Sequence, residues 1–177
     1  EIINGALDKL LEFAENKNYV ISSCRLIDKH NNFQPNAGEL PNFATILIWL
    51  SGIDDIFRKL FYLPSYQERN KIYYEKDRQV GWVGGTAMLV KGELIKKIGY
   101  LDDKIFMYGE DVEFCLRAQK FGYKTGWTDS GEIIHLGGGS LKEPHYFQWR
   151  GEFKSLVYIF DKYYGFLGGE ESGEEYV

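Results

Sequence analysis

Two adjacent acids, Glu110 and Asp111, follow a glycine and two aromatic residues in the stretch FMYGEDVEFCLRAQKFGY, residues 106–123. The periodicity after them predicts a helix. Acids are common at helix starts, because unpaired N–H groups and the positive end of the dipole stabilise each charge by about 0.3–1 kcal/mol. A carboxylate at this place can also act as a general base. Capping is the more frequent explanation of an isolated acid pair, and the pair alone leaves both open.

Two glycine-rich stretches flank the acid pair. GWVGGTAMLV (81–90) has three glycines around Trp82, which would let the backbone approach a ligand beside an aromatic ring, although a tight hairpin with a core tryptophan is the commoner arrangement. In IIHLGGGS (133–140), His135 ends an apolar strand, and the N–H groups of the following glycines could form an anion-binding nest. A histidine at a strand end is more often structural than a ligand.

The elements around these residues alternate between helical and strand patterns. The sequence pattern predicts a helix over 4–18, a buried strand over 19–27 and a polar loop over 28–42. One or two aromatic helices, broken near Ser51 and Gly52, are predicted over 43–63. Alternation of this kind predicts an α/β layer structure.

The second half of the chain continues the alternation. The spacing of Glu113 and Arg117 predicts an exposed ion pair on the helix that starts at Glu110, and Gly122 is expected to end that helix. The remaining predicted elements are a strand, glycine corner and second strand over 79–91, a short helix over 92–99, short strands at 124–127 and 132–135, a final helix over 145–165, and an acidic, flexible tail over 167–177.

Composition restricts the class of protein. The 177 residues are 44% hydrophobic and 16% aromatic, which predicts one folded domain. The net charge of -5 comes from mixed signs without a basic stripe, which argues against nucleic acid as a partner. Cys24 and Cys115 lie in apolar patterns and are expected to be buried, reduced thiols of a cytoplasmic protein. The longest apolar run, 44–50, is too short to span a bilayer, so we expect a soluble protein or one at a membrane surface.

The order of these motifs resembles the carboxyl half of family 2 glycosyltransferases of the GT-A fold, in particular the rhamnosyltransferase-like branch. The resemblance rests on GWVGGTAMLVKGELIKKIGYLDDKIFMYGEDVEFCLRAQKFGYKT at 81–125 and IIHLGGGS at 133–140. It is weaker upstream, where Asn31 and Asn32 stand in place of a usual glycine.

The resemblance implies a three-layer α/β fold with a mixed sheet and flanking helices. It also implies that residues 1–166 are the acceptor-side and catalytic part of a GT-A domain. The nucleotide-binding strands and an Asp-x-Asp-like motif are expected before residue 1. The 177 residues alone are therefore expected to be inactive and to bind nucleotide-sugars weakly.

The resemblance also implies a mechanism of inverting sugar transfer. Asp111 would be the general base, and Glu110 would orient the acceptor or raise the proton affinity of Asp111 by like-charge proximity. The helix dipole acts in the opposite direction, and the sequence leaves open which effect is larger. His135 would complete the coordination of Mg²⁺ or Mn²⁺ on the donor diphosphate.

Further roles follow from the same resemblance. Trp82 and Gly85 would line the acceptor pocket, and the donor diphosphate would be contacted by Gly137, Gly138, Gly139 and Ser140. The acceptor would be a glycan or a polyprenyl-linked sugar. Most aromatic residues of the helices at 43–63 and 145–164 are expected to pack in the core. The alternative is a peripheral membrane contact through an aromatic surface beside two cations, made of Trp49, Phe57, Arg58, Lys59, Phe61 and Tyr62.

Two other classes of protein remain open at this point. A non-catalytic carbohydrate-binding or assembly module would have kept the acceptor half of a transferase without its donor half. A metal-dependent hydrolase is weaker, because His30, His135 and His145 show no spacing typical of a ligand set.

Overall fold

The computed structural model describes all residues except 4, 58–61, 137–143 and 168–177. Two long strands, β1 (Ile21–Ile27) and β7 (Thr125–Ile134), run parallel at the centre of a mixed sheet. All other strand pairs are antiparallel. Strand β1 pairs with β2 (Phe33–Gln34) and with β6 (Leu89–Val90), and β7 pairs with β4 (Arg78–Val80). A second, two-stranded sheet consists of β3 (Ala37–Gly38) and β5 (Trp82–Val83).

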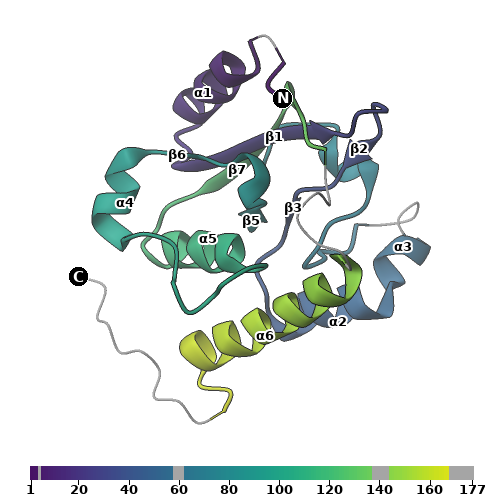
Figure 1. The fold of residues 1–177 in the computed structure, drawn as a ribbon, viewed down its shortest axis with the longest axis vertical. Helices are drawn as coiled ribbons and strands as arrows, with labels where there is room; N and C mark the ends of the chain where they lie inside the picture. Colours follow the sequence, from purple (N-terminus) through teal and green to yellow (C-terminus); the bar gives the residue numbers. More distant parts are fainter. Residues whose placement is uncertain (4, 58–61, 137–143, 168–177) are drawn as a thin grey trace.

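Helices cover both faces of the sheet (Figure 1). On one face α1 (Ala6–Asn16) packs Leu10 and Phe13 against the strand residue Cys24. On the other face lies α5 (Glu110–Lys120), with α6 and α2 beyond it (Figure 1). The other helical elements are α2 (Phe43–Ser51), α3 (Ile53–Phe57), η1 (Lys71–Tyr74), η2 (Gly85–Ala87), α4 (Gly92–Ile98) and α6 (Pro144–Tyr164).

Most predicted elements are confirmed at close to their predicted positions. The aromatic segment after the polar loop forms two helices, because Gly52 adopts a left-handed conformation (φ 66°) at the end of α2. Gly122 likewise follows α5 with φ 80°. Both cysteines are buried and free. The mixed α/β class with flanking helices is therefore correct.

Three predictions are wrong. The polar loop predicted over 28–42 contains two short strands, β2 and β3. The two short strands predicted at 124–127 and 132–135 form one continuous strand, β7, whose register against β1 shifts between Cys24 and Arg25. The ion pair of Glu113 and Arg117 is buried instead of exposed, because α6 packs over it. For Trp49, which is only 4% exposed, the expected core packing is confirmed and the membrane-surface alternative is excluded.

The burial of Trp49 has a clear physical cause. Its ring stacks on Trp149 of α6 at 5.3 Å and meets the edge of Tyr66 at 5.1 Å. Of the other residues in that predicted surface, Tyr62 is 49% exposed and donates a hydrogen bond to Glu39, whereas 58–61 lie outside the described residues. None of the helices in the described parts of the chain has the length and apolarity needed to cross a membrane.

Candidate active site

A sharp turn delivers Glu110 and Asp111 to the first turn of α5. Tyr108 and Gly109 both have positive φ, 66° and 108°. A Cβ at Gly109 would lie 2.6 Å from the Cβ of Ser155 on α6, so glycine is required there both by conformation and by space. The turn therefore fixes the acid pair against α6.

Asp111 links α5 to the glycine corner that was singled out in the sequence. Its Oδ2 accepts a hydrogen bond from the Gly85 N–H at 2.8 Å, and its Oδ1 accepts one from the Val112 N–H at 2.8 Å. The corner is itself anchored, because the Gly84 N–H donates to the Asn36 carbonyl at 2.8 Å. Asp111 therefore does contribute to the helix start, but one of its oxygens serves a different segment.

The pKa of Asp111 is raised to about 6. Burial is the largest cause, and the charge of Glu110 acts in the same direction. The N–H groups of Gly85 and Val112 lower the pKa but do not cancel the rise. The net rise is therefore due mainly to burial, an effect that the sequence comparison of Glu110 with the helix dipole did not include. Such a carboxylate is ionised at neutral pH and is a stronger base than an ordinary aspartate.

A third carboxylate, Glu152 of α6, belongs to the same acidic site. It is 7% exposed and accepts hydrogen bonds from the Gln67 amide and from the Tyr66 hydroxyl. Burial raises its pKa, and the charge of Asp111 raises it further. Within the described residues, neither Glu152 nor the Glu110–Asp111 pair forms an ion pair with lysine or arginine.

Glu110 has an oxygen without a partner. Its Oε2 is buried and makes no hydrogen bond to any part of the chain that the structure describes. Because an unpaired buried oxygen costs free energy, this atom is suited to a donor that a ligand brings, such as a sugar hydroxyl.

Of the two residues predicted to line an acceptor pocket, Gly85 is exposed and Trp82 is buried. Gly85 is exposed beside Asp111, and a Cβ there would meet the Asp111 side chain at 3.7 Å. Trp82 is 8% exposed, and its Nε1 donates to the Tyr66 carbonyl at 2.7 Å. The Trp82 ring therefore packs in the core next to the site and offers little surface to a sugar in this conformation.

His135 lies just beyond the end of β7, where its N–H donates to the Ile27 carbonyl at 2.8 Å. The Gln34 side-chain amide donates to the His135 carbonyl at 3.3 Å, so its Oε1 faces the His135 Nδ1 at 2.8 Å. This arrangement places the proton on Nδ1 and the lone pair on Nε2, which is the form that a metal ligand needs.

The donor set around His135 fits a metal only in part. Among the described residues, no three or more His, Cys, Asp or Glu side chains come together in a way that could hold a metal ion. His135 would therefore supply a single nitrogen ligand from this part of the chain. The predicted diphosphate contacts, Gly137, Gly138, Gly139 and Ser140, lie outside the described residues.

Sequence reasoning missed Glu152 and Asn36. Asn36 is buried, donates to the Ser23 hydroxyl and the Cys24 carbonyl, and supports the glycine corner through its own carbonyl. A signal for Glu152 was present in the preceding residue, Gly151. A glycine inside a helix often marks close packing, and a Cβ at Gly151 would lie 2.9 Å from the Met107 carbonyl.

Comparison with known proteins gives two kinds of relative. No protein-family model matches the chain. Over 59 residues it is 36% identical to an N-acetylglucosaminyl-diphospho-decaprenol L-rhamnosyltransferase of Mycobacterium tuberculosis, covering 33% of this chain and 19% of that protein. Over 137 residues it is 26% identical to the low-salt glycan biosynthesis hexosyltransferase Agl10 of Haloferax volcanii, covering 76% of this chain and 39% of that protein.

Both relatives are named as glycosyltransferases, and they support a glycosyltransferase assignment for this chain. The aligned parts span less than two-fifths of the length of either relative.

Proposed function

We propose that this chain is the acceptor-side, catalytic part of an inverting family 2 glycosyltransferase with a GT-A fold. It would transfer a sugar from a nucleotide-sugar to a glycan or lipid-linked acceptor. The observation that carries the proposal is Asp111, a carboxylate with its pKa raised to about 6, held by the Gly85 N–H at the start of α5. The names of the two relatives support the reaction class.

Asp111 would act on the acceptor hydroxyl. The hydroxyl oxygen attacks the anomeric carbon of the donor, its proton passes to an Asp111 oxygen, and the bond from the anomeric carbon to the diphosphate breaks. The Gly85 N–H and the Val112 N–H keep the carboxylate oriented for this step.

Glu110 and Glu152 would support that base. The buried Oε2 of Glu110 would accept a hydrogen bond from the acceptor sugar. Glu152, which accepts hydrogen bonds from Gln67 and Tyr66, is coupled to Asp111, because the charge of Asp111 raises the pKa of Glu152.

A divalent cation, Mg²⁺ or Mn²⁺, would offset the negative charge that develops on the diphosphate leaving group. His135 is the residue of this chain that would bind it, through the Nε2 lone pair that the Gln34 contact leaves available.

The proposal is tested by Asp111→Asn in the complete natural protein. Nucleotide-sugars would be screened against oligosaccharide and isoprenoid diphosphate-linked acceptors, and the product measured with a radiolabelled donor sugar. The variant should transfer about 10²–10⁴-fold more slowly with donor affinity nearly unchanged, because the amide keeps the shape but does not accept the proton. Near-normal turnover of Asp111→Asn together with a loss in Glu110→Gln would assign the base to Glu110. Normal turnover of both variants would mean that the acid pair only stabilises the start of α5 and takes no part in catalysis.

A further inference from the structure

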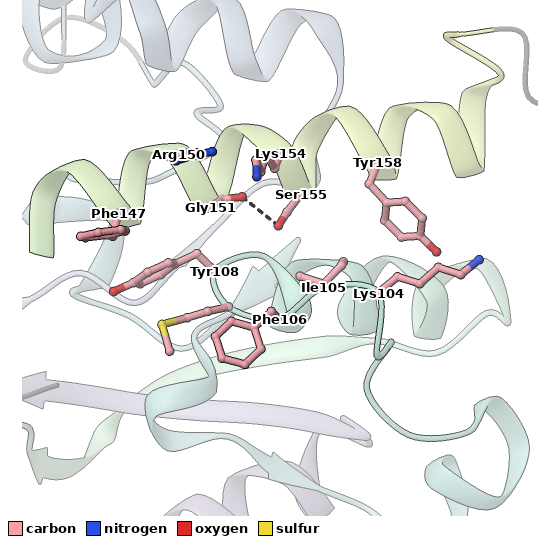
Figure 2. A pocket seen from close by; sticks show the side chains of 11 residues that line it. Lys104, Ile105, Phe106, Tyr108, Phe147, Arg150, Gly151, Lys154, Ser155 and Tyr158 are labelled. Carbon is pink, nitrogen blue, oxygen red and sulfur yellow. Dashed lines mark hydrogen bonds between the residues drawn. The ribbon is translucent and has the colours of Figure 1, made fainter. Parts of the chain in front are cut away.

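A pocket of about 450 Å³ lies between the loop that precedes α5 and one side of α6 (Figure 2). Its volume lies in the range of sites that hold small organic ligands. The residues that line it come from these two segments alone: Lys104, Ile105, Phe106, Met107, Tyr108, Phe147, Arg150, Gly151, Lys154, Ser155 and Tyr158.

Three cations line this pocket and no acid does. Lys104 comes from the loop, whereas Arg150 and Lys154 lie one turn apart on α6. None of the three forms an ion pair within the described residues. This charge contrasts with the net charge of -5 of the whole chain and with the acidic site at Asp111. Clustered lysine and arginine side chains of this kind suit a phosphate or diphosphate group.

Several of the other lining side chains are apolar and open to solvent. Phe106 is 93% exposed, Phe147 is 48% exposed and Met107 is 38% exposed. Figure 2 shows Tyr108 and Phe147 at one end of the pocket, Lys104 and Tyr158 at the other, and the two α6 cations on the helix between them. Exposed aromatic and methionine side chains beside cations match a ligand that is both anionic and apolar.

The pocket adjoins the proposed base. Tyr108 precedes Asp111 by three residues, so no more than about 11 Å of chain separates them. Across the gap, a Cβ on Gly151 would touch the Met107 carbonyl, and the pKa of the next residue of α6, Glu152, is raised by the charge of Asp111. The pocket and the proposed base therefore lie next to each other along the same loop and the same side of α6.

We propose that this pocket binds the phosphate groups and the first isoprenoid units of an isoprenoid diphosphate-linked sugar, the acceptor whose hydroxyl is presented to Asp111. This inference rests on the proposed function, and it narrows the acceptor to a lipid-linked one. Lys104, Arg150 and Lys154 bind the phosphates, and the exposed side chains of Phe106, Met107 and Phe147 contact the hydrocarbon.

The test uses farnesyl diphosphate as the probe and isothermal titration calorimetry on the complete natural protein. The variant Arg150→Gln/Lys154→Gln removes two positive charges from the pocket. Lys96→Gln/Lys97→Gln removes two charges from α4, which does not line the pocket, and serves as the matched control. All four side chains are exposed, so neither variant should disturb folding, which thermal melting checks. Lys104→Gln removes the positive charge that the loop before α5 contributes to the pocket.

Loss of the two α6 cations should raise the dissociation constant for farnesyl diphosphate at least about tenfold, since hydrogen bonds to charged groups are the strong ones. Lys104→Gln should weaken binding in the same direction, and the α4 control should bind normally. Inorganic diphosphate should bind more weakly than farnesyl diphosphate, with the same dependence on charge. Absence of farnesyl diphosphate binding, equal binding by the α6 variant and its control, or equal competition by UDP would each overturn the assignment.

The two proposals fail in different ways. If transfer to oligosaccharides depends on Asp111 but the α6 variant binds and uses lipid acceptors normally, the proposed function stands and the pocket assignment is wrong. If farnesyl diphosphate binding depends on Arg150 and Lys154 but no acceptor receives a sugar, the binding site stands and the acceptor role is overturned together with the proposed function.

Discussion

Two carboxylates on the same helix, Asp111 and Glu113, lie in opposite electrostatic surroundings. Asp111 is held by backbone N–H groups beside other acids, and its pKa is raised to about 6. Glu113 is fully buried, and burial alone would raise its pKa. Hydrogen bonds from Arg117, Tyr163 and Lys162 more than offset this, so its pKa is lowered. A helix of eleven residues thus carries one carboxylate suited to accept a proton and one suited to remain charged.

The surroundings of Glu113 are those of a structural ion-pair network. Arg117 Nη2 lies 2.8 Å from Oε2 and Lys162 Nζ lies 2.9 Å from Oε1. Lys162 also pairs with Asp102 at 2.7 Å, and Arg117 donates to the Tyr100 carbonyl. The network joins α5, α6 and the loop between α4 and α5. The comparison teaches that hydrogen-bond partners decide the proton affinity of a buried carboxylate: the paired Glu113 has a lowered pKa, and Asp111, which has no cationic partner among the described residues, has a raised one.

The largest expected effect on stability is that of Glu113→Gln. The amide would leave Arg117 and Lys162 partly unpaired, and the free energy of unfolding at neutral pH should fall by about 3 kcal/mol. A carboxyl with a lowered pKa stabilises the fold above its unfolded value of 4.5, and this contribution is lost as pH falls through the folded pKa. Urea unfolding at several pH values should therefore show the difference from wild type narrowing in acid. A constant difference would contradict the network's role.

An effect of opposite sign, and no larger, is expected for Asp111→Asn. The folded pKa of about 6 lies above the unfolded value of 3.8, so ionisation of Asp111 destabilises the fold as pH rises between these values. The neutral amide avoids that cost, and at about 1.36 kcal/mol per pKa unit the variant should gain up to about 3 kcal/mol above pH 6 and nothing near pH 3.5. Thermal melting across this range measures it. A loss of stability at neutral pH would identify Asp111 as a structural residue like Glu113.

The smallest stability effect is expected for Gly85→Ala. The new Cβ would meet Asp111 at an ordinary contact distance of 3.7 Å, so the free energy of unfolding should change by less than about 0.5 kcal/mol. Because the methyl group would stand beside the proposed base, the KM for acceptor should rise severalfold. Gly109→Ala is the contrasting control, since it meets Ser155 at 2.6 Å with φ 108° and should destabilise clearly. An unchanged KM in Gly85→Ala would show that the acceptor does not bind next to Gly85.

Features that depend on residues close together in the chain could be predicted from the sequence. Periodicity located α1 and α5, and the break between α2 and α3 was visible at Gly52, because these features depend on neighbouring residues. The acid pair and the glycine corner were both identified, and the structure joins them through the bond from Gly85 to Asp111.

Features that depend on distant packing were not predicted. Glu113 was expected at the surface, because nothing near it in the chain shows that Lys162 and Tyr163 of α6 cover it. Glu152 was missed for the same reason, since only the contact of α6 with the turn at Gly109 brings it to Asp111.

The central claim is that Asp111 acts as the base, and its most direct test is the pH dependence of kcat/KM for sugar transfer by the complete natural protein. Because the base must be ionised, log kcat/KM should rise with a slope near one below the pKa of about 6 and level off above it. Glu113→Gln should keep this profile, whereas the residual activity of Asp111→Asn should lose the inflection. A profile without an inflection near 6 in the wild type, or the same inflection in Asp111→Asn, would contradict the assignment.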